Sequence, residues 1–252
     1  SGKGAATDLI PTLNASATPV SVGGTETHQV IFGYFGRVNY DYNEKYLLSV
    51  NTRYDGASNL GLTNKWGFFP GISLGWNMHK EDFWKIFPDR LLSLKLRASY
   101  GVNGNISGLG PYTAQGSYSV GSRYNGVAAV QNTSLANADL KWEESKTLDF
   151  GIDLGIFKNR INVLFDIYRR RTDNLLTSLS LPQSTGFGSI LTNLGSLENK
   201  GVEIEVNANI LPDNTAFQWN LAFNASTVNN KIIKLPDNGT ENNRIGGYYV
   251  WD

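Results

Sequence analysis

Hydrophobic side chains occupy every second position along much of the chain. Residues 91–103 read LLSLKLRASYGVN, in which Leu, Ala, Tyr and Val alternate with Ser, Lys, Arg, Gly and Asn. Because successive side chains of a strand point to opposite faces, this segment predicts a strand with one apolar and one cationic face. Seven more segments repeat the alternation, within residues 32–42, 46–55, 66–78, 147–156, 161–170, 202–210 and 217–224. The sequence therefore predicts an all-β, antiparallel fold of about eight long strands.

This alternation fits two architectures, a soluble β-sandwich and an up-and-down transmembrane β-barrel. In a sandwich the apolar face packs against a second sheet, whereas in a barrel it faces lipid and the polar face lines the lumen. Strand length favours the barrel, because soluble strands usually have about five or six residues and tilted membrane strands need about nine to eleven. Most of the alternating segments have the greater length.

The connections between the predicted strands alternate in length along the chain. The short ones are 43–45, 158–159 and 212–214, and the long ones are 56–65, 104–145, 173–197 and 230–252. Residues 79–90 are intermediate and fit this alternation least well. Short turns at one end and long loops outside the cell are typical of outer-membrane barrels. Aromatic residues also gather near strand ends, as in the two girdles of such barrels, although rings that cap a sandwich core would give a similar pattern.

Composition narrows the function only slightly. Lys and Arg number 22, as do Asp and Glu, so the formal net charge is zero and offers no general case for nucleic-acid binding. There are no cysteines, which excludes disulfides and thiolate metal sites. Mean hydropathy is −0.27. No stretch approaches about 18 apolar residues, which argues against a transmembrane helix but not against membrane strands.

Five blocks of the sequence resemble one known family in that family's order. They are FGRVNYDYNEKYLLSVNTRYDGASNLG, WGFFPGISLGWNM, LKLRASYGVNGN, KWEESKTLDFGIDLGIFKNRINVLFDIYRRRTDNLL and NLGSLENKGVEIEV. The family is that of the SusC/RagA-type TonB-dependent outer-membrane transporters. The resemblance implies that residues 31–252 are an arc of a larger, roughly 22-stranded barrel, with residues 1–30 as an extracellular loop. It also implies a fragment, because the signal peptide, the plug domain and the TonB box of the family have no counterpart in this sequence.

What the resemblance implies for function is nutrient uptake across the outer membrane. The whole protein would take a glycan or a peptide from a SusD-like surface lipoprotein. TonB would then act through the missing N-terminal part to displace the plug. This activity needs no cofactor and no covalent chemistry, so no enzyme is expected. Two alternatives stay open, a soluble β-sandwich that binds carbohydrate and an outer-membrane barrel enzyme, which would need a nucleophile–base–orienter set that the sequence does not display.

Charged residues on the polar faces of the predicted strands are expected to line the lumen. They are Arg37, Arg53, Lys95, Arg97, Asp149, Asp153, Glu203 and Glu205. The two acidic pairs have i, i+2 spacing, which places each pair on one face of its strand. A glycosidase would need such carboxylates at a set separation across a sugar ring, and ion pairing with the lumen-facing cations is the simpler explanation.

The long loops hold the candidate ligand contacts. Aromatic rings stack on sugar faces, and the aromatic residues selected on this ground are Tyr112, Tyr118, Tyr124, Trp142, Tyr248 and Tyr249. The alternative is that these rings pack the loops against one another. No metal site is expected, because His28 and His79 each lack a ligand partner at metal spacing, and a calcium site at Asp237 with Glu241 has only turn chemistry in its favour.

Overall fold

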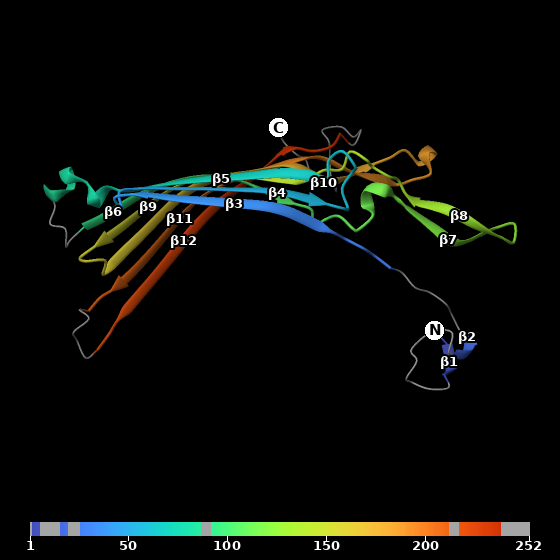
Figure 1. Ribbon diagram of the computed structural model, residues 1–252, viewed down its shortest axis with the longest axis horizontal. Coiled ribbons are helices and arrows are strands. Elements are labelled where there is room, and N and C mark those ends of the chain that lie inside the picture. Colours follow the sequence, from blue (N-terminus) through green and yellow to red (C-terminus); the bar gives the residue numbers. More distant parts are fainter. Residues whose placement is uncertain (1, 6–15, 20–25, 87–91, 212–216, 238–252) are drawn as a thin grey trace.

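The computed structural model describes residues 2–5, 16–19, 26–86, 92–211 and 217–237. Most of these residues form one curved antiparallel sheet (Figure 1). Its strands are β3 (Ile31–Tyr42), β4 (Tyr46–Ala57), β5 (Trp66–Asn77), β6 (Leu92–Asn105), β9 (Glu143–Ile156), β10 (Ile161–Ser180), β11 (Ser189–Asn209) and β12 (Asn220–Lys234). The spatial order is β12-β11-β10-β9-β6-β5-β4-β3, so each strand pairs with its neighbours along the chain. The prediction of an all-β, antiparallel, up-and-down fold is confirmed.

The remaining elements are small. Two hairpins form separate two-stranded sheets, β1 (Gly2–Ala5) with β2 (Ser16–Pro19) and β7 (Ser117–Tyr124) with β8 (Val127–Ser134). The 3-10 turns are η2 (Met78–Lys80), η3 (Asp82–Ile86), η4 (Thr113–Gln115) and η5 (Gln183–Thr185). Among the described residues there is no helix with the length and apolar character that a membrane span requires.

Of the three predicted short connections, 43–45 and 158–159 lie within the described residues and 212–214 lies outside them. Asn43 and Glu44 both have positive φ, and the Lys45 N–H donates to the Tyr42 carbonyl over 2.9 Å, which makes a type I′ turn between β3 and β4. The β9–β10 connection is tight as well but longer than the predicted two residues: it spans 157–160, Phe157, Lys158 and Asn159 all have positive φ, and the Arg160 N–H donates to the Phe157 carbonyl over 3.4 Å. Type I′ turns match the twist of paired strands, so Asn43 and Glu44 fix the register of the β3–β4 hairpin.

The prediction of a long loop over 173–197 is wrong. β10 continues to Ser180 and β11 begins at Ser189, so the connection is only 181–188. The apolar alternation is lost first because residues 169–174, RRRTDN, are polar at every position. A β-bulge at Asn174, where φ is 58°, then shifts the register with β11 and interrupts the period of two. The predicted loops 104–145 and 230–252 are also too long, since the first contains β7 and β8 and β12 reaches Lys234.

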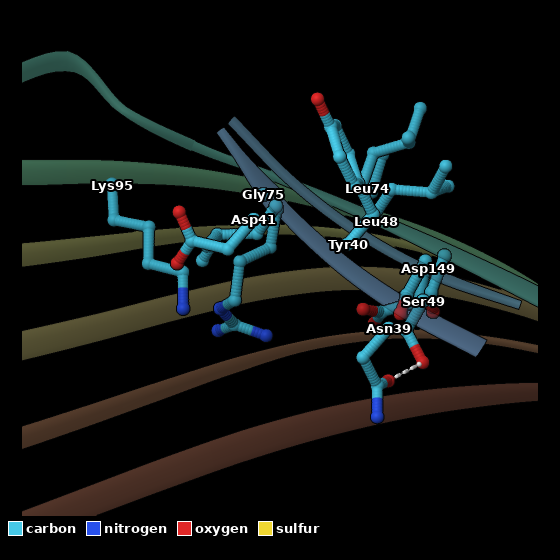
Figure 2. A pocket seen from close by; sticks show the side chains of 14 residues that line it. Asn39, Tyr40, Asp41, Leu48, Ser49, Leu74, Gly75, Lys95 and Asp149 are labelled. Atoms are coloured by element: carbon cyan, nitrogen blue, oxygen red, sulfur yellow. Dashed lines mark hydrogen bonds between the residues drawn. The ribbon is translucent and has the colours of Figure 1, made fainter. Parts of the chain in front are cut away.

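The strand register aligns the apolar positions on one face of the sheet. A single row across it contains Tyr40, Leu48, Leu74, Ala98, Phe150, Ile167, Val202 and Thr227. Figure 2 shows Tyr40, Leu48 and Leu74 leaving the sheet on the side opposite to Asn39 and Asp149. Leu74 is 54% exposed and Phe150 is 55% exposed. Within the described residues no second large sheet covers this apolar face, which favours a barrel wall over a sandwich.

The buried core lies at the long-loop end of the wall. It brings together Ala57, Leu60, Phe69, Ile106, Leu109, Ala114, Leu140 and Trp142. Leu60 and Leu140 have no exposed surface. These residues come from β4, the β4–β5 connection, β5 and the long β6–β9 connection, so the core fixes the long connections onto the sheet.

Candidate functional site: the polar face and the loop end

The eight charged residues predicted to share the polar face do share it. Strand pairing carries one row from Asn39 through Ser49, Ser73 and Ser99 to Asp149. The predicted residues lie at positions of the same parity: Arg37, Arg53, Lys95, Arg97, Asp149, Asp153, Glu203 and Glu205. Part of this face forms an open hollow of about 410 Å³, lined on its polar side by Asn39, Ser49, Ser73, Lys95 and Asp149 (Figure 2). That these residues line a closed lumen stays a prediction.

Arg97 is the centre of the charge pairing on this face. Its Nε donates to the Asp153 Oδ1 over 2.7 Å, and its Nη2 donates to the Asp166 Oδ1 over 2.9 Å. Gly151 lies between Arg97 and Asp166 in the register, and a Cβ there would stand 2.6 Å from the guanidinium carbon. The absent side chain lets the guanidinium lie flat across three strands, so β6, β9 and β10 are tied together by charge-assisted hydrogen bonds.

The other predicted pairs do not form. Arg53 donates instead to Asp55 of its own strand, over 3.0 and 3.1 Å. Glu205 accepts a hydrogen bond from the Asn207 amide over 2.6 Å, and within the described part of the chain neither it nor Glu203 has an ion pair. Side chains on one face but three or more strands apart are too distant to pair, which the strand order decides and the sequence alone does not reveal.

Aromatic rings mark both ends of the apolar face. At the short-turn end, Tyr46 stacks on Trp76 with centroids 6.4 Å apart. At the loop end, Tyr54 stacks on Trp66 with centroids 4.9 Å apart. On β3, Phe32 belongs to the loop-end group and Tyr42 to the short-turn group, and the two residues are ten positions apart. At about 3.3 Å per residue and a tilt of about 40°, the two groups are about 25 Å apart, the height of the apolar band of an outer-membrane barrel.

Comparison with known proteins settles the family. The sequence model of the family described as "TonB dependent receptor-like, beta-barrel" matches residues 4–251. The chain belongs to this family. It is accordingly a segment of an outer-membrane β-barrel, and the alternative of a soluble β-sandwich is wrong.

Two curated relatives and one solved structure place this receptor barrel more closely. It is 39% identical to "TonB-dependent receptor P39" of Formosa agariphila over 96% of this chain and 23% of that protein. It is 35% identical to "TonB-dependent receptor SusC" of Bacteroides thetaiotaomicron over 83% of this chain and 21% of that protein. It also superimposes on the "RagAB peptide transporter" with a TM-score of 0.76 and 26% identity, over 91% of this chain and 25% of that one. The chain thus spans about a quarter of the length of these relatives, and the SusC/RagA resemblance is confirmed.

The predicted ligand-contact aromatics of the receptor loops fall into two groups. Tyr118 and Tyr124 are 66% and 81% exposed on the β7–β8 hairpin, and Tyr112 accepts a hydrogen bond from the His28 N–H over 3.1 Å. Trp142 is only 7% exposed, because its ring packs against Phe69 with centroids 5.2 Å apart. The packing alternative therefore describes Trp142, while the exposed tyrosines present free rings. Tyr248 and Tyr249 lie outside the described residues.

The loop end is also held by side-chain amides that hydrogen-bond to backbone groups, which sequence reasoning missed. Asn193 donates to the Lys141 carbonyl over 2.9 Å and accepts from the Lys141 N–H over 3.0 Å. Asn137 donates to the Leu191 carbonyl over 2.7 Å. These amides hydrogen-bond to backbone groups of Lys141 and Leu191, and they thereby link the β6–β9 connection to β11.

The histidines have ordinary partners. His28 contacts Glu26 at 2.7 Å, and the His79 ring contacts the Leu94 carbonyl at 3.0 Å. Within the described residues no three His, Asp or Glu side chains gather closely enough to hold a metal ion. Of the suggested calcium pair, Asp237 is described and Glu241 lies outside the described residues.

Proposed function

We propose that this barrel segment is part of a SusC-like transporter that imports glycans or peptides together with a SusD-like lipoprotein. The observation that carries the proposal is the match to SusC and to the RagAB peptide transporter over most of the chain. The uncovered apolar face and its aromatic ends are what a wall in contact with lipid requires. Residues 31–252 are proposed to supply the wall, and residues 1–30 an extracellular loop.

The polar face is proposed to line the lumen of the complete receptor. The clamp of Arg97 with Asp153 and Asp166 holds three strands in register from the inside. Unpaired Glu203 and Asn-rich neighbouring positions leave a hydrated surface against which the plug can lie and be displaced. TonB would act through the part of the receptor that precedes this chain, so no residue described above is proposed to contact it. Transport by this route needs no cofactor and no covalent step.

The exposed tyrosines of the β7–β8 hairpin are proposed to contact the ligand or the lipoprotein. The hairpin projects beyond the sheet at the loop end (Figure 1), and its tip is an Asn125-Gly126 type I′ turn. Tyr118 and Tyr124 offer flat rings that stack on sugar faces or pack on peptide side chains. Ser119 on β7 and Asn132 on β8 can hydrogen-bond to hydroxyl or amide groups of a ligand.

Uptake by cells that carry the complete receptor tests this function. Labelled oligosaccharides and labelled peptides would be offered separately, with and without TonB. The proposal expects TonB-dependent uptake of one class, a loss of uptake in the Tyr118→Ala/Tyr124→Ala variant, and co-purification of a surface lipoprotein. A Val127→Ala/Val130→Ala variant of the paired strand is the matched control and should retain uptake. TonB-independent uptake, or uptake of neither class, would overturn the proposal.

A further inference from the structure

The connection from β5 to β6 folds back along the outer face of the barrel wall. Between η2 and η3, the Glu81 carboxylate accepts hydrogen bonds from the Tyr46 hydroxyl over 2.6 Å and from the Trp76 Nε1 over 3.1 Å. Tyr46 and Trp76 are register partners on the apolar face. The connection that fits the alternation of loop lengths least well therefore lies against the apolar face of the wall.

This segment extends the aromatic row of the short-turn end. Rings of Tyr42, Tyr46, Trp76 and Phe83 follow one another with centroids 6.4 Å apart at each step. Phe83, the last of them, is 52% exposed although it lies outside the strands. Tyr and Trp rings favour the boundary between headgroups and acyl chains, so the row gives the depth at which Phe83 meets the membrane.

Two charged residues of the segment, Glu81 and Lys80, are paired within the protein. A carboxylate near lipid is costly unless it is paired and hydrogen-bonded. Besides its two aromatic donors, Glu81 has Lys45, whose Nζ lies 3.0 Å from Oε2, and these two side chains are only 24% and 13% exposed. Lys80 in turn pairs with Glu44 at 2.8 Å, in a more exposed position. An acidic residue that would otherwise oppose contact with a membrane is thus neutralised in place.

We propose that residues 78–84 form an interfacial anchor that inserts Phe83 into the phospholipid headgroup region of the periplasmic leaflet. The occupant is phospholipid because the segment continues the lipid-facing surface of β4 and β5 without a break. This inference rests on the outer-membrane location of the barrel and is independent of what the receptor transports. The anchor fixes the depth of the wall in the bilayer at its periplasmic end.

Spin labelling of the complete receptor in phosphatidylethanolamine/phosphatidylglycerol vesicles tests the anchor. A nitroxide on Phe83→Cys would be compared with labels on Leu74→Cys, in the middle of the apolar face, and Asn125→Cys, at the hairpin tip. We expect the label at 83 to collide more with oxygen and less with a water-soluble nickel chelate than the label at 125. Equal nickel collision rates at 83 and 125 would overturn the proposal. Protection from both reagents would overturn it as well, because a protein partner would then cover the site.

A second variant separates the anchor from a merely exposed turn. Glu81→Ala removes the acceptor that holds the segment against Tyr46 and Trp76, so the label at 83 should gain nickel collisions. Glu44→Ala removes the more exposed ion pair between the β3–β4 turn and Lys80 of the segment, and it should leave the collision rates of the label at 83 unchanged. The same response in both variants would contradict the role assigned to Glu81.

Discussion

Two glycines on β6 test how tightly the loop-end core is packed. A Cβ added at Gly104 would stand 2.2 Å from the Phe69 Cζ, whereas a Cβ at Gly101 would meet nothing within 4 Å. Neither glycine has a left-handed φ, so Ala fits the backbone at both positions. Phe69 is 5% exposed, and its ring is confined by Trp142 and by the close approach of Gly67. The ring therefore cannot swing away from a methyl group at position 104.

The expected difference between the two alanine variants follows from opposing effects. Overpacking of a confined core costs about 1–3 kcal/mol. Replacing a strand glycine returns about 0.5–1 kcal/mol, because the unfolded chain loses freedom. Gly104→Ala should therefore destabilise the receptor by about 1–2 kcal/mol, and Gly101→Ala should be neutral or stabilise it by up to about 1 kcal/mol.

Thermal and denaturant unfolding of the complete receptor in detergent would measure this difference. The boiling-dependent shift in gel mobility and the loss of tryptophan fluorescence are two independent readouts of the barrel. In a Phe69→Ala background the clash is absent, so Gly104→Ala should cost little there, and a double-mutant cycle would show positive coupling. Equal stability of the two single alanine variants, or no coupling to Phe69, would refute the packing described here.

Three further predictions address the wall and its periplasmic turn. Arg97→Gln should lower the free energy of unfolding by about 1–2 kcal/mol in denaturant, because Asp153 and Asp166 both lose a half-buried cationic partner. Leu74→Arg should lower stability by about 2–4 kcal/mol in lipid vesicles, while Ser73→Arg on the opposite face should cost less. Hydrogen bonds from Tyr46 and the Lys45 and Trp76 side chains lower the pKa of Glu81 from 4.5 to about 2, so their stabilisation should be complete above pH 4.5 and lost as the pH falls towards 2. Tryptophan fluorescence followed over this pH range should show the loss of these contacts at the β5–β6 connection, and a Glu81→Gln variant should show no such change.

The alternation of side chains was enough to predict the strands and both faces of the wall. It succeeds because one face meets lipid and the other meets water, so each strand carries a strong period-two signal. It fails after residue 170, where residues 169–174 are polar at every position and Asn174 then shifts the register, and inside residues 104–145, where none of the described side chains of β7 and β8 is buried. The turns near 43–45 and 158–159 were predictable for the same reason, since they are the short gaps between two alternating segments.

The candidate site was predictable only in part, because its contacts depend on which strands are adjacent. The polar parity of Arg97 and Asp153 was visible in the sequence, whereas the choice of Asp166 as second partner depends on β10 lying beside β9. Phe69 is an aromatic residue at a polar-face position, and that exception to the alternation was the one signal of a core at the loop end. The role of Glu81 had no signal, since hydrogen bonds across a turn leave no periodicity.

The loop end of the wall is held by a buried apolar core, and this core fixes the base of the β7–β8 hairpin. At the loop end, η4 and the segment after β8 both enter the buried core, and the Asn137 N–H donates to the Ala114 carbonyl over 3.0 Å. Both stems of the β7–β8 hairpin are therefore fixed to the wall, although the hairpin itself projects into solvent. Tyr118 and Tyr124 therefore lie on a hairpin whose base is fixed, and under the proposed function a fixed base would reduce the entropy lost when a ring stacks on a ligand. Trp142 is part of the buried core at that base, so under the same proposal it would position the tyrosines and would not contact the ligand itself.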